Sequence, residues 1–165
     1  MNNKILTALL ALTFMSAALA GCTSNDDTDD ADDTTSDVVK IGFLNPATGP
    51  LAQDAAGFEY GALQAVIDLN AAQTTTVFEA VVADSGCDGT VGAAAAQSLV
   101  DANVVAVAGA ACSGASMAAN AVLSAAGIPM ISYASTNPSL SDATAYPNFF
   151  RVVPSDAIQG PAAAA

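Results

Sequence analysis

Apolar and polar positions along this chain alternate in blocks that predict strands followed by helices. Short runs of β-branched residues are typical of strands buried in a parallel sheet, and apolar residues at three- and four-residue spacing are typical of helices. Strands are predicted at 38–44, 76–83, 104–109, 128–133 and 149–153. Helices are predicted at 51–72, 90–103 and 115–126, with Thr90 or Asp88 near the N-terminus of the second. Asp156 is predicted to be the N-cap of a further helix. This order predicts an α/β fold with a doubly wound, mostly parallel sheet.

The segment from 104 to 136 organises this prediction, because it contains a strand, a helix and a second strand in succession. The apolar run at 104–109 indicates a strand that is buried on both faces. The helix after it is expected to end at Gly127, which fits a C-cap position. The apolar residues expected together on one side of that helix are Met117, Ala121, Val122 and Ala125.

A helix that joins two neighbouring parallel strands makes a right-handed crossover. Such a unit brings the turn Cys112-Ser113-Gly114 next to the turn Ala134-Ser135-Thr136, each at the carboxyl end of a strand. Open α/β sheets bind their ligands at this edge. The two turns are therefore the predicted binding site.

The first 37 residues predict export and tethering. Lys4 precedes an apolar run at 5–20, which is short for a membrane span and typical of a signal peptide. The run ends Leu19-Ala20-Gly21-Cys22, which resembles a lipobox, so 1–22 is predicted to be a lipoprotein signal peptide with Cys22 as the lipidated residue. The alternative is an ordinary signal peptide that contains a cysteine. Residues 23–37, rich in Asp, Thr and Ser, predict an acidic disordered linker before a domain at 38–165.

Composition excludes several classes of function. Three Lys and Arg residues against 16 Asp and Glu argue against nucleic acid, since phosphate binding needs clusters of cations. No glycine-rich phosphate loop follows a strand, and two remaining cysteines without any histidine argue against a metal site, so neither a cofactor nor a metal is expected. The strand-to-helix turn at 110–114 resembles a nucleophile elbow only superficially, because no histidine can act as its base. We therefore expect no enzyme, with a hydrolase-like enzyme as a remote alternative.

Binding of a small zwitterion is the chemistry that these residues suit. Ser113 begins a helix, whose free N–H groups and dipole favour a carboxylate. Ser135, Thr136 and the carbonyl of Ala134 can serve an ammonium group. The alternative is local: Ser113 or Ser116 caps the helix, while Ser135, Thr136 and Asn137 only shape a turn.

Two cysteines remain once Cys22 is assigned to the lipobox. Cys87 and Cys112 each lie in a loop after a predicted strand, and exported proteins meet an oxidising compartment. A disulfide between the two loops and a pair of free buried thiols are both compatible with this placement.

Short motifs in a fixed order then indicate a family. They are Lys40-Ile41-Gly42-Phe43, Thr48-Gly49-Pro50, Cys87-Asp88, Ile128-Pro129-Met130-Ile131-Ser132, Thr136-Asn137-Pro138 and Phe150-Arg151-Val152-Val153-Pro154-Ser155-Asp156. Over 38–165 the chain resembles the leucine/isoleucine/valine-binding proteins, which are solute receptors of ABC importers with the type I periplasmic-binding-protein fold.

The resemblance implies roles residue by residue. The disulfide of the family's first lobe falls on Cys87 and Cys112. The ligand serine falls on Ser113, the carbonyl that accepts from the ligand ammonium on Ala134, and the ligand threonine on Thr136.

Two departures from the family matter for the ligand. Asp54 stands where the family often has an aromatic residue beside the ligand side chain, so a polar or cationic ligand is an alternative to a branched aliphatic one. The family's second lobe is not represented, and the pattern stops as a helix begins near Asp156, so we expect a truncated first lobe. Closure of two lobes desolvates the ligand, so half a cleft is expected to bind weakly.

The function expected from the sequence is that of a solute-binding lipoprotein for a branched-chain-type amino acid or a related amide. Its expected partners are the permease subunits of an ABC importer. The resemblance and the lipobox imply a monomer when complete, anchored at the outer face of the cytoplasmic membrane. The ligand-binding region of a sensor or receptor is the alternative within the same fold.

Overall fold

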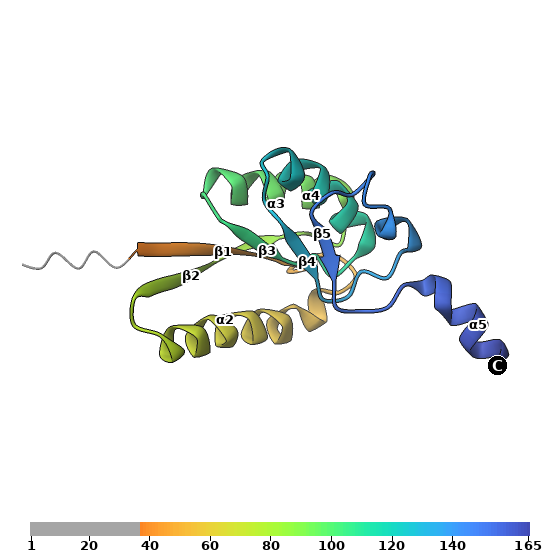
Figure 1. Ribbon diagram of the computed structural model, residues 1–165, viewed down its shortest axis with the longest axis horizontal. Helices are drawn as coiled ribbons and strands as arrows, with labels where there is room; N and C mark the ends of the chain where they lie inside the picture. Colours follow the sequence, from red (N-terminus) through yellow and green to blue (C-terminus); the bar gives the residue numbers. More distant parts are fainter. Residues whose placement is uncertain (1–36) are drawn as a thin grey trace, which may run out of the picture. The chain divides into compact units, whose positions relative to one another are not determined.

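Residues 37–165 form five parallel strands in one sheet in a computed structural model of the chain, which describes these residues (Figure 1). The strands are β1 (Asp37–Asn45), β2 (Thr76–Asp84), β3 (Ala106–Ala108), β4 (Met130–Ser132) and β5 (Phe149–Arg151). Their order is β2-β1-β3-β4-β5, and every neighbouring pair is parallel. The predicted signal peptide and Cys22, and linker residues 23–36, lie outside the described residues.

Helices cover both faces of this sheet. The helix α2 (Ala55–Ala72) follows the 3-10 helix η1 (Ala52–Asp54) and packs on β1 and β2. The helices α3 (Gly89–Asp101) and α4 (Ser113–Ala125) pack against each other on the opposite face (Figure 1). The remaining helices are η2 (Pro138–Ser141), η3 (Asp156–Ile158) and α5 (Gln159–Ala164). The prediction of a doubly wound α/β sheet is therefore confirmed.

The core lies between the sheet and the pair α3 and α4. Its fully buried side chains include Leu44, Leu99, Val107, Leu123 and Met130. Small residues let the two helices approach closely: a Cβ added at Gly92 would lie 3.0 Å from the carbonyl oxygen of Ala115. An alanine-rich composition thus builds a core in which helix backbones come into near contact.

The buried face of α4 is not the face that the sequence predicts. Ala121 and Ala125 are exposed, and Met117 and Val122 are only partly buried. The residues that α4 buries are Ala115, Ser116, Ala119, Asn120 and Leu123. Two of these are polar, and their donor groups have partners: Ser116 donates to the carbonyl of Ala110, and Asn120 Nδ2 donates to that of Pro147, while Asn120 Oδ1 is buried with no hydrogen-bond partner among the described residues.

The strand at 104–109 is also less buried than expected. The observed strand is shorter, Ala106–Ala108, and Val105 is 55% exposed although Val107 is buried. On the two strands that follow, Ile131 and Phe150 are 44% and 58% exposed. The helix α2 packs on β1 and β2, and no other described helix covers that face over β4 and β5.

Local signals at the helix ends are confirmed in two cases and wrong in one. Asp88 is the N-cap of α3, since its side chain accepts from the N–H groups of Thr90 and Val91. Gly127 follows α4 with a φ of +73°, which favours glycine. Asp156, however, caps nothing, because Ser155 is the N-cap of η3 and its hydroxyl accepts from the Ala157 N–H.

Candidate functional site

The candidate site lies at the carboxyl edge of the sheet, where the loops after β3 and β4 meet the segment after β5. All strands are parallel, so these connections emerge at one edge. The turn Ala134-Ser135-Thr136 follows β4, and Ser113 begins α4 after the loop that follows β3. The structure thus brings together the two turns that the sequence predicts as neighbours.

A buried cluster of hydroxyl groups joins these two loops. Ser116, Ser132 and Ser135 are fully buried around the carbonyl of Ala110, which lies 3.1, 2.6 and 3.1 Å from their respective Oγ atoms. Ser135 Oγ also lies 3.1 Å from the carbonyl oxygen of Ala111. Because the hydroxyl of Ser135 has these buried partners, it connects the loops, and its predicted contact with a ligand remains a prediction.

Ser113 does not cap its helix. The N-cap of α4 is Cys112, and no side chain caps this end of the helix. The Ser113 hydroxyl instead accepts from the N–H of Asn137 at 3.2 Å and keeps its own hydrogen to donate. The alternative of a purely local cap is therefore wrong for Ser113, whereas Asn137 does cap η2 by accepting from the Ser139 N–H.

Thr136 is bonded to the segment after β5. Its hydroxyl donates to Asp156 Oδ2 at 2.8 Å, and the Asp156 N–H donates to the Thr136 carbonyl at 2.9 Å. Gln159 Nε2 donates to the other carboxylate oxygen of Asp156 at 3.1 Å. A carboxylate that the sequence assigns to a helix cap therefore lies beside the predicted ligand threonine.

The other two predicted ligand residues are placed less tightly. Ala134 is partly buried in the loop after β4, and its N–H donates to Ser132 Oγ at 3.3 Å. Asp54 is exposed at the end of η1, where its side chain caps nothing. No hydrogen bond within 37–165 joins Asp54 to the turn at 134–136, so its role in ligand preference remains a prediction.

Cys87 and Cys112 are neighbours. Their Cα atoms lie 5.1 Å apart, within the range of disulfide-bonded cysteines, and their sulfur atoms are in contact. This contact joins the loop after β2 to Cys112, the N-cap residue of α4, although β1 lies between β2 and β3 in the sheet. The start of α4, and with it Ser113, is therefore fixed to the loop after β2.

Asp84 holds another loop of the same edge and was not singled out from the sequence. Its carboxylate accepts from the Thr48 hydroxyl at 2.6 Å, the Thr48 N–H at 3.1 Å and the Gly86 N–H at 2.8 Å. Burial raises the pKa of Asp84, but these hydrogen bonds outweigh it and bring the pKa below its ordinary value of 3.8. The carboxylate is thus ionised and anchors the loop at 46–50.

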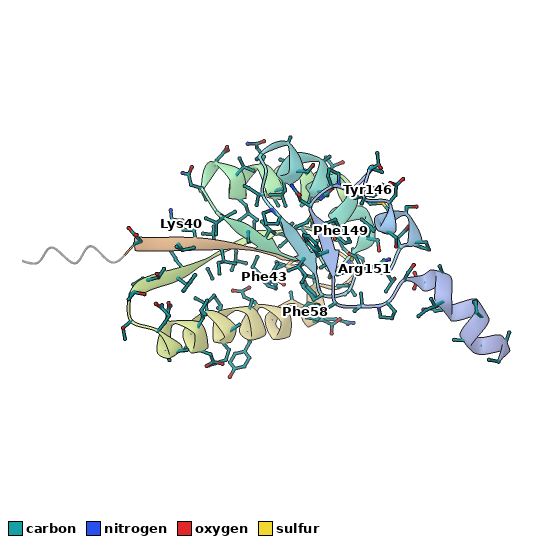
Figure 2. All side chains as sticks on the ribbon, viewed as in Figure 1. Lys40, Phe43, Phe58, Tyr146, Phe149 and Arg151 are labelled. Atoms are coloured by element: carbon teal, nitrogen blue, oxygen red, sulfur yellow. A yellow bond between two sulfur atoms is a disulfide. The ribbon has the colours of Figure 1, made fainter. Side chains whose placement is uncertain are left out.

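An apolar cavity of about 360 Å³ lies between α2 and the sheet. Its aromatic lining is formed by Phe43, Phe58 and Tyr133, and the ring centroid of Tyr133 lies 5.7 Å from that of Phe43 and 5.2 Å from that of Phe58. Figure 2 labels Phe43 and Phe58. Burial raises the pKa of Tyr133 to about 12, and its hydroxyl lies 3.4 Å from the Leu44 carbonyl oxygen. A zwitterion suits the polar edge better than this cavity, because the cavity offers its charges no partners.

Neither a membrane-spanning helix nor a metal cluster is present in the described part of the chain. Among residues 37–165, no helix is both long and apolar enough to cross a membrane. Within the same range, no group of three or more Cys, Asp or Glu side chains is arranged to hold a metal ion.

Comparison with known proteins places these features in a family. Residues 60–165 match the model described as the receptor family ligand binding region. The chain is 31% identical, over 159 residues, to a leucine-, isoleucine-, valine-, threonine- and alanine-binding protein of Pseudomonas aeruginosa. The aligned region covers 95% of this chain and 40% of that protein. A stretch of 59 residues is 54% identical to metabotropic glutamate receptor 6 of Oryctolagus cuniculus, covering 36% of this chain and 7% of the receptor.

Solved structures agree with this placement. The substrate-binding protein LivJ of Streptococcus pneumoniae in complex with isoleucine superimposes with a TM-score of 0.66 at 34% identity, over 72% of this chain and 34% of that one. The leucine-binding protein LivK of Thermotoga maritima gives a TM-score of 0.62 at 27% identity, over 76% and 35%. The resemblance and the fold predicted from the sequence are therefore confirmed, and the chain spans about 40% of the length of the Pseudomonas relative.

Proposed function

This chain belongs to the family described as the receptor family ligand binding region, and on that basis we propose that it forms an amino-acid-binding lobe of a solute-binding protein for an ABC importer. The observation that carries the proposal is that two consecutive residues contact two different kinds of group: a carboxylate, which attracts a cation, and the start of a helix, which attracts an anion. Thr136 contacts the Asp156 carboxylate, whereas Asn137 contacts Ser113 at the start of α4. An α-amino acid carries an ammonium and a carboxylate on one carbon, so it fits between such groups.

The carboxylate of the ligand is assigned to the start of α4. Ser116 makes the first intrahelical bond, to the carbonyl of Cys112 at 3.0 Å, so the preceding N–H groups of the first turn are free of helix partners. The Ser113 hydroxyl keeps a hydrogen to donate, and the helix dipole favours a negative charge at this end. Ser113 is therefore the carboxylate-binding side chain of the proposal.

The ammonium of the ligand is assigned to Asp156, Thr136 and the carbonyl of Ala134. Asp156 supplies the negative charge, and Thr136 accepts from the ammonium while it donates to that carboxylate. Hydrogen bonds between charged groups are about twice as strong as neutral ones. In this proposal the negative charge that the ligand ammonium needs comes from Asp156 in this lobe and not from a second lobe.

The side chain of the ligand is proposed to be branched and aliphatic. Support comes from the printed names of the relatives, which include a leucine-, isoleucine-, valine-, threonine- and alanine-binding protein and a substrate-binding protein in complex with isoleucine. Asp54 favours a polar or cationic side chain instead if it contacts the ligand. A panel of ligands separates these two possibilities.

A receptor is the second candidate, and it shares the same binding chemistry. The local identity with metabotropic glutamate receptor 6 favours it, but that match covers 36% of this chain.

We also propose that the chain binds its ligand without catalysis. Cys112 lies at the strand-to-helix turn where a nucleophile would be, but its sulfur contacts that of Cys87, and no histidine is available as a base.

Export and lipid anchoring belong to the proposal, together with docking to permease subunits at the outer face of the membrane. The apolar run at 5–20 and the lipobox ending in Cys22 support it. Metabolic labelling with a lipid precursor tests the anchor: the parent chain is expected to incorporate label, and a Cys22→Ser variant is not. Label retained by the variant contradicts the anchor.

Calorimetric titration of the chain with isoleucine tests the binding proposal. Isoleucinamide lacks the carboxylate and 3-methylpentanoate lacks the ammonium, so each removes one set of charged partners. Each is expected to bind about ten- to hundred-fold more weakly than isoleucine, since a charge-assisted hydrogen bond contributes roughly 1.5–3 kcal/mol. Glutamate and arginine in the same series test the alternative that Asp54 raises.

Equal affinity for isoleucine and its two analogues would contradict the proposed binding site for a zwitterion. Preference for arginine over isoleucine, with both charges still required, would keep the site and replace the proposed side-chain class.

A further inference from the structure

Arg151 is the only arginine in the chain and lies at the end of β5, directly beside the candidate site. It is partly buried, and Figure 2 shows its side chain near the end of that strand. One guanidinium nitrogen donates to the carbonyl of Asn137 at 3.0 Å and lies 3.4 Å from that of Ser135. The other terminal nitrogen donates to the hydroxyl of Ser141. These partners are neutral oxygen atoms of residues 135–141, so the charged guanidinium of Arg151 hydrogen-bonds to the segment that follows β4.

The two carbonyl groups belong to the residues on either side of Thr136. A single guanidinium nitrogen therefore contacts the backbone on both sides of the proposed ligand threonine. The same loop is held at Asn137 by Ser113 and at Thr136 by Asp156. Three elements, α4, β5 and the segment after β5, thus fix the direction in which Thr136 points.

We infer that Arg151 is a positioning residue for ligand binding, which holds the backbone on both sides of Thr136 so that its hydroxyl and the Ala134 carbonyl face the ammonium. This inference rests on the proposed function. The planar guanidinium presents five donors in a fixed fork and can reach two carbonyls and a hydroxyl together. A lysine ammonium is a point charge on a flexible stem and cannot hold all three in one geometry.

The test compares Arg151→Lys with Lys40→Arg in the full chain. Lys40 lies near the start of β1, away from the carboxyl edge, so its exchange swaps the same residue types outside the site. Three quantities are measured: the melting temperature, hydrogen exchange of the peptide that covers 133–141, and the affinity for isoleucine. Arg151→Gln is a second variant that also removes the charge.

Positioning predicts an effect confined to the loop. Arg151→Lys is expected to accelerate exchange in 133–141, to leave exchange in α3 unchanged, and to weaken isoleucine binding about ten-fold at a temperature far below the melting transition. Lys40→Arg is expected to match the parent in all three measurements. Arg151→Gln is expected to change in the same direction as Arg151→Lys, by more.

Several results overturn the inference. Exchange in 133–141 that matches the parent shows that the loop keeps its geometry without Arg151. A lower melting temperature with faster exchange throughout the domain shows a general structural role. If the parent chain binds none of isoleucine, glutamate and arginine, the proposed function fails, and exchange in 133–141 still decides whether Arg151 positions the loop.

Discussion

Thr136 and Asp156 are joined by hydrogen bonds in both directions across the carboxyl edge of the sheet. The Thr136 hydroxyl donates to the Asp156 carboxylate at 2.8 Å, and the Asp156 N–H donates to the Thr136 carbonyl at 2.9 Å. The pair connects the loop after β4 to the segment after β5. A group that binds at Thr136 therefore meets a negative charge, which is what an ammonium requires.

Asp156→Asn removes this charge while its amide oxygen can still accept from Thr136. Affinity for isoleucine is expected to fall about ten- to hundred-fold, because the ammonium loses a charged partner. Affinity for 3-methylpentanoate, which has no ammonium, should hardly change. Calorimetry measures both. Asp68→Asn is the matched control, since Asp68 is exposed on α2 and accepts a hydrogen bond from Gln64. Unchanged isoleucine affinity in Asp156→Asn would place the ammonium elsewhere.

Two glycines in helices predict opposite effects of the same substitution. A Cβ at Gly61 in α2 meets no atom within 4 Å, so Gly61→Ala is expected to stabilise the domain by roughly 0.8–1 kcal/mol through helix propensity. A Cβ at Gly92 in α3 would meet backbone atoms of Ala115 at 3.0 and 3.1 Å, so Gly92→Ala is expected to destabilise it by about 1–3 kcal/mol. Chemical denaturation measures both. Stabilisation by Gly92→Ala would contradict the close packing of α3 on α4.

Acidification is expected to release the loop at 46–50. Hydrogen bonds hold the pKa of Asp84 below its ordinary value of 3.8, so folding favours the ionised form. That contribution to stability is present in full above the unfolded-state pKa, which is about 3.9, and is lost as the pH falls through the folded-state pKa. The difference in melting temperature between the parent and Asp84→Asn should therefore be constant near neutral pH and shrink below about pH 4. A difference that grows on acidification would contradict the sign of the shift.

Cys87 and Cys112 are predicted to form a disulfide. Intact mass is expected to rise by about 2 Da on reduction, as two hydrogens are added. The double variant Cys87→Ser/Cys112→Ser is expected to lose roughly 3–4 kcal/mol of unfolding free energy, on the loop-closure model for a sequence separation of 25. Cys22→Ser, outside the domain, is the control and should unfold like the parent. An unchanged mass on reduction would indicate free thiols.

Local patterns in the sequence were sufficient for the elements and for the neighbourhood of the site. Apolar runs and helical spacing identified five strands and three main helices, because both depend on residues only two to four positions apart. Asp88 and Gly127 were recognisable for the same reason, since a cap is a contact within one turn. The alternation of strands and helices then required parallel strands, and parallel strands place the turns with Ser113 and Thr136 at one edge.

Only the tertiary structure decided which polar groups meet at that edge. Ser116 and Asn120 occupy the buried face of α4, where the Ser116 hydroxyl donates to the carbonyl of Ala110 and Asn120 Nδ2 donates to that of Pro147, whereas periodicity alone favours apolar residues there. Asp156 and Arg151 reach the loop at 134–141 from residues 10 to 20 positions away. Such contacts depend on strand order and register, since β4 pairs with β5 and brings Ser132 opposite Arg151. No spacing rule along the chain encodes that pairing.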